Sequence, residues 1–338
     1  MYQICIYNYD TNLEWKILKE IENIIESEDY FVSKNWEGGP HIQIVSKKYP
    51  SEDMMLELKE NLNGIFKLSR ISKEEENKTK NIYQKGQKKM ANLEQKSSVR
   101  DIRAHGIVEI LEYNFFYHSK KLTELYIGER IRSHKLLMKT RKLIEDEEVL
   151  TDMLFPVIFS KISNIYKENE KNKGYFSYVS HVQGFFELSK KQEKPFCEEQ
   201  FEKVYQEKCE AMRKTKIKYL EVIEEWFDYF RGCYEAYLQQ LNELVDDSYY
   251  EELSVAVSQM EGKFNNEFHK NFVRYSKEIN FTRNPKATAY RITINLLYLL
   301  LPFFNISALK KQIYIYMAYR DVEEQKRLTW REELKIVN

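Results

Sequence analysis

The stretch Trp36-Glu37-Gly38-Gly39-Pro40-His41-Ile42-Gln43-Ile44 contains the most specific local pattern in the chain. Its two glycines and its proline predict a tight turn, because glycine adopts left-handed backbone angles freely and proline fixes its own φ angle. The turn leads into a strand, on which side chains alternate between two faces. His41, Gln43 and Val45 are therefore expected on one face of a sheet, and Ile42 and Ile44 on the other.

The sequence on both sides of this turn predicts a small α/β unit in residues 1–70. Strand-forming residues fill Tyr2–Tyr9, and a second strand is expected to begin at Tyr30. Apolar residues then recur at helical spacing in two segments. They are Leu13, Ile17, Leu18, Ile21, Ile24 and Ile25 in the first segment, and Met54, Met55, Leu58, Leu62 and Phe66 in the second.

Residues 71–105 are expected to form a polar, basic connection. From Lys67 to Arg103 the chain has eleven Lys or Arg residues and five Asp or Glu residues, an excess of six positive charges. Most runs of this kind are solvated helices or loops. The functional alternative is a docking strip for an acidic peptide.

Residues 106–338 are expected to form a helical body. Ile107, Ile110, Leu111 and Phe115 would share one helix face, and helical patterns continue through 129–145 and 148–168. A further pattern runs from Glu198 to Asp246, with a break expected near Gly232. The segment 286–320 is the most apolar. The predicted fold class is α+β: a small N-terminal α/β sheet unit packed on a large, mainly helical body as one integrated fold.

Composition excludes several classes of protein. The 338 residues contain 53 basic and 53 acidic side chains, so no net charge attracts nucleic acid or a membrane surface. The four cysteines have neither metal-site spacing nor a disulfide framework, which predicts reduced, mostly buried thiols. Ile292–Leu309 is apolar but interrupted by polar residues and a proline, which favours a buried helix over a membrane span. With no signal-like segment at the N-terminus, a cytoplasmic protein is expected.

Four segments resemble, in the same order, the thiopeptide-type domain that forms the C-terminal part of lantibiotic dehydratases. The first is the Gly-Gly-Pro-His turn and its strand. The other three are Arg103-Ala104-His105-Gly106 running into Glu109, Tyr178-Val179-Ser180-His181 before Phe185 and Phe186, and Arg291-Ile292-Thr293-Ile294-Asn295. The first is fairly specific; for the others, the shared order carries the resemblance.

The domain that these segments resemble eliminates glutamate from glutamylated Ser or Thr in the full-length dehydratases. Its reaction relies on arginines that bind the glutamate carboxylates and on a His that transfers protons. Here Gln43 and Val45 occupy the positions of those arginines, Arg291 that of the His, and only Arg103 matches. Gln and Val offer no positive charge, so they do not replace a bidentate arginine. The resemblance is therefore greatest to the stand-alone pyridine synthases, which share this chain's length and join two dehydroalanines in a formal aza-[4+2] cycloaddition.

Such an enzyme is a lyase or cyclase that acts on a ribosomally made precursor peptide, both leader and core, alongside other enzymes of its pathway. Ring closure is followed by loss of water and of the leader, which leaves a pyridine in a macrocycle. The reaction needs positioning and proton transfer, and neither a metal nor a redox cofactor is expected. The abundant rings, 25 Tyr and 19 Phe, suit a wall that stacks against the substrate.

The candidate catalytic residues are His41, His105, Glu109, Tyr290 and Arg291. His41 either donates to a reacting carbonyl or closes the turn, and His105 is either an acid–base group or a helix-start residue. Glu109, one helical turn later, would orient His105, although a surface role is the more common one. An arginine on an apolar helix is costly unless it is paired or faces a cavity, so Arg291 points to a site.

The candidate substrate-binding residues are Trp36, Gln43, Arg103, His181 and Asn295. Asn295 lies one turn after Arg291 and would hold a peptide carbonyl, unless it is a buried structural residue. His181 is expected more often as a packed interior residue. The remaining histidines, His118, His134 and His269, are expected at the surface.

Two other functions are open at this point. One is the glutamate-elimination subunit of a split dehydratase, with Arg103 and Arg291 as a rearranged carboxylate grip. The other is a non-catalytic module that binds a leader peptide and delivers it, for which the basic strip is the best argument. A purely helical scaffold would leave the ordered motifs unexplained.

Overall fold

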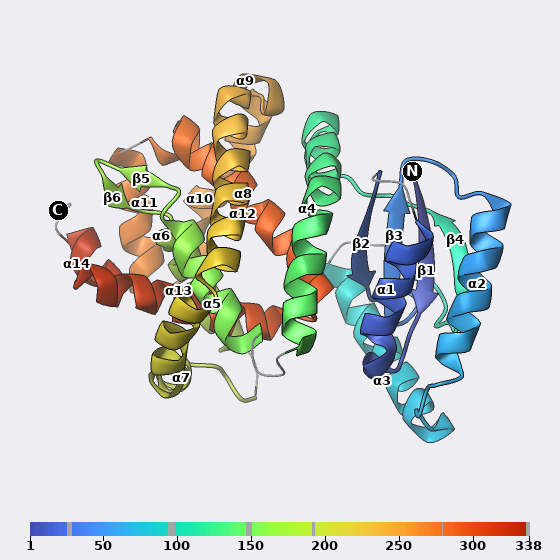
Figure 1. The fold of residues 1–338 in the computed structure, drawn as a ribbon. Coiled ribbons are helices and arrows are strands. Elements are labelled where there is room, and N and C mark those ends of the chain that lie inside the picture. The colour runs from blue at the N-terminus through green and yellow to red at the C-terminus, as the bar shows by residue number, and fades with distance from the viewer. Residues whose placement is uncertain (26–28, 94–98, 147–150, 191–192, 279, 336–338) are drawn as a thin grey trace. The chain divides into compact units, whose positions relative to one another are not determined.

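The structure, a computed structural model, describes residues 1–25, 29–93, 99–146, 151–190, 193–278 and 280–335. The chain forms two compact units. The first comprises Met1–Phe116 and Ile127–Lys135, and the second Tyr117–Tyr126 and Leu136–Asn338. A four-stranded sheet lies in the first unit and the rest is mainly helical (Figure 1), which confirms the predicted α+β class.

The sheet of the first unit is antiparallel throughout. Its strands are β1 (Tyr2–Tyr7), β2 (Tyr30–Asn35), β3 (His41–Ser46) and β4 (Val108–Glu112), in the order β2-β3-β1-β4. The register sets Ile4 opposite Ile44 and Ile6 opposite Ile42, and β3, the strand expected after the glycine turn, lies between β1 and β2. Central strands exclude water from both faces, and every residue from His41 to Val45 is buried.

Helices cover the sheet. Helix α1 (Glu14–Ile24) lies across one face in Figure 1, and α2 (Glu52–Phe66) packs against α1. Ser51 caps α2 by accepting a hydrogen bond from the Met54 amide at 3.2 Å. On the opposite face, Phe31 and Val45 pack with Ile127. A 3-10 turn, Thr11–Leu13, precedes α1.

One expectation for the first unit is corrected. Val108–Glu112 forms strand β4 and not a helix, because its alternating run Val108-Glu109-Ile110-Leu111 pairs with β1. The spacing of the apolar residues does not distinguish a helix from a strand here, because a short strand can also have apolar residues at positions i, i+3 and i+4. Within the polar connection, Lys73–Leu93 forms helix α3.

The second unit contains the remaining elements. Helix α4 (Lys120–Asp146) contributes its residues 127–135 to the first unit and the others to the second. The helices that follow are α5 (Thr151–Ser163), α6 (Tyr175–Ser189), α7 (Glu198–Lys218), α8 (Leu220–Gln239), α9 (Leu241–Leu244), α10 (Asp247–Lys263), α11 (Glu267–Glu278), α12 (Pro285–Leu300), α13 (Ala308–Lys326) and α14 (Trp330–Lys335). A short hairpin, β5 (Lys167–Glu168) and β6 (Lys171–Asn172), and 3-10 turns at Phe281–Arg283 and Leu301–Phe304 connect them.

The core of this unit is built from apolar helices. Helix α13 packs on α5, α6 and α7, and α12 packs on α8. Among the described residues, Pro285–Phe304 is the one segment long and apolar enough to cross a membrane, and 72% of it is buried inside the protein. Such burial is the property of a core helix, which is the role expected for this stretch.

The long pattern from Glu198 to Asp246 breaks at Tyr219 and not at Gly232. Tyr219 leaves the helical conformation with φ −113° and ψ 30°, which ends α7 and begins α8. Gly232 lies on the exposed side of α8, where an added Cβ would meet no neighbour. An exposed glycine weakens a helix by about 1 kcal/mol, which packing along the rest of α8 offsets.

Candidate functional site

The glycine turn holds His41 through a backbone hydrogen bond. Gly38 and Gly39 have positive φ angles of 83° and 111°, which only glycine adopts without strain. The His41 Nδ1–H donates to the Gly39 carbonyl oxygen at 2.9 Å, while Nε2 is buried and has no hydrogen-bond partner among the described residues. Burial lowers the pKa of His41 to about 4, so the ring is neutral near pH 7.

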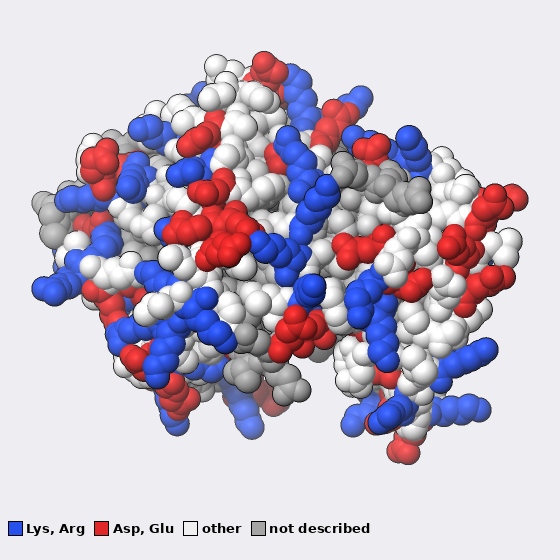
Figure 2. Space-filling view, viewed as in Figure 1, with Lys and Arg blue, Asp and Glu red and all other residues white. Residues whose placement is uncertain are grey.

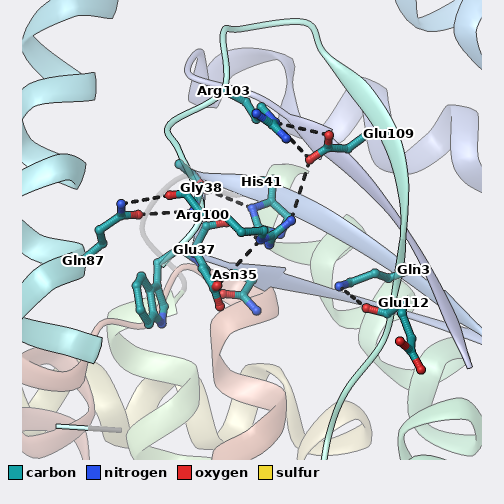
Figure 3. Close-up of polar contacts among 12 residues, drawn as sticks. Gln3, Asn35, Glu37, Gly38, His41, Gln87, Arg100, Arg103, Glu109 and Glu112 are labelled. Atoms are coloured by element: carbon teal, nitrogen blue, oxygen red, sulfur yellow. Dashed lines mark hydrogen bonds and ion pairs between the residues drawn. The ribbon is translucent and has the colours of Figure 1, made fainter. Parts of the chain in front are cut away.

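Glu109 is the centre of a charged cluster above β1. It accepts a hydrogen bond from the Tyr7 hydroxyl at 2.8 Å and from Arg103 Nε at 3.2 Å, and Arg100 Nη1 lies 3.7 Å away. Figure 3 shows Arg103 and Glu109 facing one another. Burial alone would raise the pKa of Glu109, but the hydrogen bonds from Tyr7 and Arg103 outweigh it and hold the pKa below its ordinary value.

The segment 100–106 is fastened to the glycine turn. The Gln87 side chain accepts a hydrogen bond from the Gly38 amide at 3.3 Å and donates to the Arg100 carbonyl at 3.0 Å, as Figure 3 shows. Arg103 N donates to the Gly38 carbonyl at 2.8 Å. These hydrogen bonds position the backbone of Arg100 and Arg103 so that both side chains lie beside Glu109.

The other predicted residues of the first unit are also held internally. Gln43 donates to the Gln3 side chain, and Gln3 donates to the Glu112 carbonyl at 3.0 Å, so an amide chain crosses three strands. Trp36 is half-buried, and its backbone closes the turn with Gly39. The expectation that Glu109 orients His105 is wrong, because β4 is a strand. His105 Nδ1 instead accepts from the Tyr9 amide at 3.1 Å.

The described part of the basic strip does not present a single sign of charge. The first turn of α3 contains Glu74, Glu75 and Glu76, and Glu76 pairs with Lys80 at 2.7 Å. On the face in Figure 2, basic and acidic side chains are interspersed. Residues 94–98 of the strip lie outside the described residues. A polar groove lies between α3 and Asp101-Ile102 and is lined by Asn77, Lys80, Asn81, Gln84 and Gln87.

The second unit contains a cavity of about 460 Å³, within the range of about 300–1,000 Å³ usual for ligand sites. Its walls come from α6, α10, α11, α12 and α13 and from the segments between helices. A third of the lining residues carry phenyl or phenol rings: Tyr166, Phe176, Phe185, Phe264, Phe272, Tyr275, Phe281 and Tyr290. No Asp or Glu is among the described residues that line it, whereas Lys173 and Arg291 are.

Arg291, Asn295 and Tyr290 all line this cavity, as their spacing on one helix predicts. The Arg291 guanidinium lies 5.4 Å from the Phe281 ring centroid, and its Nη1 is 3.5 Å from the Tyr249 hydroxyl. Its Nη2 is buried and has no partner among the described residues. Lys173 is by contrast neutralised by Glu333 at 2.9 Å. Of the two cations among the described lining residues, Arg291 is therefore the one without a carboxylate partner.

Tyr290 and Asn295 differ in their partners. Burial raises the pKa of Tyr290, whose hydroxyl lies near Ser177 and Tyr178 without a well-formed hydrogen bond to either. Asn295 donates to the Tyr117 hydroxyl and also lines the cavity. The Asn295 amide is thus already hydrogen-bonded, whereas the Tyr290 hydroxyl is buried and has no hydrogen-bond partner among the described residues.

Two histidines reach the same cavity. His181 lines it with an exposed side chain, whose ring packs edge-on with its centroid 5.2 Å from that of Tyr298. His269, expected at the surface, is buried, with 1% of its area exposed, and so is His134, with 8%. The amphipathic spacing of α11, with Phe268, Phe272 and Tyr275 buried, is the signal that could have placed His269 inside.

The sheet and the helical remainder have the fold of the thiopeptide pyridine synthases. The solved structure of the pyridine synthase TbtD, from thiomuracin biosynthesis, matches over 96% of this chain and 97% of its own, with a TM-score of 0.68 and 11% identity. The crystal structure of TsrL matches over 99% and 97%, with a TM-score of 0.58 and 12% identity. No protein-family model and no curated protein sequence matches the chain. At these identities the likeness is one of fold.

Proposed function

We propose that the chain is a peptide-modifying enzyme of the pyridine synthase type. It closes a six-membered ring between two dehydroalanines of a precursor peptide in the cavity of the second unit. The observation that carries this proposal is the likeness to TbtD over nearly the whole length of both chains. The likeness extends over both units, so it is not explained by one shared domain attached to an unrelated remainder.

The cavity has the chemistry that such a ring closure requires. Its aromatic walls can stack two planar olefins face to face and exclude water. Arg291 Nη2 and the Asn295 side chain, one turn apart on α12, can hold the carbonyls of the two reacting residues. Polarisation of a carbonyl by Arg291 favours the imidic tautomer of the amide, which is the form that adds across the second olefin.

Proton transfers are needed for the tautomerisation and for the later loss of water and of the leader. His181 is suited to them because its side chain is exposed and lines the cavity, and an imidazole can both accept and donate a proton. The buried Tyr290 hydroxyl can return one. His41 and His105, also predicted as catalytic, form internal hydrogen bonds in the first unit and are weaker candidates.

Glutamate elimination is a second candidate, favoured by one observation. Arg291 has no carboxylate partner among the described residues and lies in a cavity without acidic lining, as a grip on a glutamyl carboxylate would. Arg103 argues against it, because Glu109 already occupies that guanidinium.

The proposed partner is a leader-bearing precursor peptide in the cytoplasm. In a delivery module, the polar groove beside α3 would bind the leader without any turnover.

Mass spectrometry of two peptides tests the proposal: a leader-bearing peptide with two dehydroalanines, and a glutamylated serine peptide. Loss of water and of the leader from the first supports ring closure. Loss of glutamate from the second would replace the proposal with elimination, and binding without a mass change would favour delivery. Arg291→Met should lower turnover at least 100-fold, whereas Arg283→Met, which removes an exposed arginine paired with Asp247, should not.

A further inference from the structure

Ser180, His269 and Asn266 form a hydrogen-bonded series on the wall of the cavity. Ser180 lies on α6 and is half-buried, and its Oγ is 3.3 Å from His269 Nε2. His269 Nδ1 is 2.8 Å from Asn266 Oδ1. Ser180 and His269 both line the cavity. Neither the fold nor the proposed ring closure assigns a role to these three residues together.

The direction of each hydrogen bond follows from the backbone. The His269 amide donates to Asn266 Oδ1 at 3.0 Å, which caps the N-terminus of α11 and identifies that atom as an oxygen. His269 Nδ1 must therefore carry the proton that it shares with the same oxygen. Nε2 is left with a lone pair that faces Ser180, so the serine hydroxyl donates to it.

This order of nucleophile, base and orienting group is the arrangement that activates serine and cysteine in hydrolases of unrelated folds. Desolvation lowers the pKa of His269 to about 4, which keeps Nε2 unprotonated at neutral pH. When the ring takes a proton, the face of Phe264, stacked at 4.6 Å, and Asn266 Oδ1 both stabilise the cation. Arg291 in the same cavity offers positive charge to a developing oxyanion.

We propose that Ser180 is an activated nucleophile, which gives the chain an acyl-transfer activity toward small apolar esters. Ser180 Oγ attacks the ester carbonyl and forms an Oγ–C bond, while its proton moves to His269 Nε2. The bond to the alcohol oxygen breaks, and that oxygen takes the proton from Nε2. A water molecule then attacks the acyl group, gives its proton to Nε2, and Ser180 leaves with that proton. Aromatic lining selects an apolar acyl group.

This activity does not depend on the proposed ring closure, so the two can fail separately. The test is the rate at which an alkyl fluorophosphonate labels the full chain, followed by intact mass and peptide mapping. We expect one adduct, on Ser180, and none in Ser180→Ala. Ser258→Ala is the control: Ser258 is exposed on α10, is not among the lining residues of the cavity, and its hydroxyl donates to the Val255 carbonyl at 2.9 Å. It should be labelled at the wild-type rate.

Variants of the two supporting residues test the activation itself. His269→Gln should slow labelling at least tenfold. Asn266→Asp keeps a good helix cap and places a carboxylate beside the Nδ1–H of His269, so it should be labelled at least as fast as the wild type. This variant tests the activation independently if His269→Gln fails to fold. Hydrolysis of p-nitrophenyl butyrate should follow the same order. Absence of an adduct, an adduct on another residue, or equal rates in wild type and a folded His269→Gln would each overturn the proposal.

Discussion

Gly39 shows how much one backbone position determines in the first unit. At its φ of 111°, an added Cβ would lie 2.5 Å from the Tyr9 hydroxyl. Gly39→Ala should therefore lower the free energy of unfolding by at least about 2 kcal/mol, from backbone strain together with this clash. Urea unfolding followed by circular dichroism measures the change. Gly64→Ala is the control: it is helical with open space around it, and it should gain about 0.5–1 kcal/mol. Similar behaviour of the two variants would contradict the assignment of the turn.

His134 is a buried residue whose polar ring atoms contribute no hydrogen bond among the described residues. It packs on Tyr30 at 4.8 Å, and both of its ring nitrogens are buried without hydrogen-bond partners among the described residues. His134→Phe keeps the ring contact and removes two desolvated polar atoms, so it should raise the free energy of unfolding by about 1 kcal/mol or more. His134→Ala is the comparison and should lose stability, because it leaves a cavity. A destabilised His134→Phe would show that a hydrogen bond to His134 had been overlooked.

At this scale the sequence predicted those residues whose spacing is local. The turn that holds His41 and the shared face of Arg291 and Asn295 follow from adjacent positions. The partner of Arg103 cannot be derived in the same way, because the spacing of Ile107, Ile110 and Leu111 predicts a helix where β4 forms. His134 and His269 are also buried by tertiary packing, and the residue type alone does not predict this because histidine is found both inside proteins and at their surface.

Among the elements, α6 depends on a close approach at its first turn. Gly174 precedes α6, and a Cβ there would lie 2.2 Å from the Ser163 carbonyl oxygen and 2.7 Å from the Tyr290 hydroxyl. Gly174→Ala must push α6 away from α5 and α12, so it should cost more than about 2 kcal/mol of stability and reduce fluorophosphonate labelling of Ser180. The matched variant Gly184→Ala, on the same helix with its nearest neighbour at 3.6 Å, should be tolerated. Equal stability of both variants in urea would refute the close packing.

The elements themselves were predicted well where a pattern was long and periodic. Strands β1 and β3 and helices α1, α2 and α12 follow their apolar spacing. Failures occurred where two structures share one pattern, as in β4, or where a helix ends without glycine or proline, as at Tyr219. There the deciding contact comes from a distant segment.

For the whole molecule, buried histidines predict an acid-sensitive fold. His41 and His134 have folded-state pKa values lowered to about 4 by desolvation, against about 6.5 in the unfolded chain. Between those values the unfolded chain binds more protons, so stability is full above about pH 7 and falls as the pH drops toward 4. The urea midpoint should be lower at pH 5 than at pH 7, before the lowered pKa of Glu109 contributes. His134→Phe should show a smaller difference. A midpoint that does not change over this range would exclude the prediction.

The fold class could be predicted from the sequence, but the cavity could not. The described residues that line it fall between Tyr166 and Gln312, on α6, α10, α11, α12 and α13 and on the segments between helices, and no local motif brings those positions together. The segments that carry the resemblance contain Arg291, His181 and Asn295, which line the cavity. His269 lies in none of these segments.

The position of α12 and α13 in the chain has a consequence for how the protein is made. These two helices follow α5, α6, α7 and α8 in the chain, yet they pack on all four of them. In a nascent chain that ends before α12, the faces of α5, α6 and α7 that pack on α13, and the face of α8 that packs on α12, lack those contacts. During synthesis the second unit therefore exposes apolar surface until α13 is complete, which is a stage at which a chain is prone to aggregate.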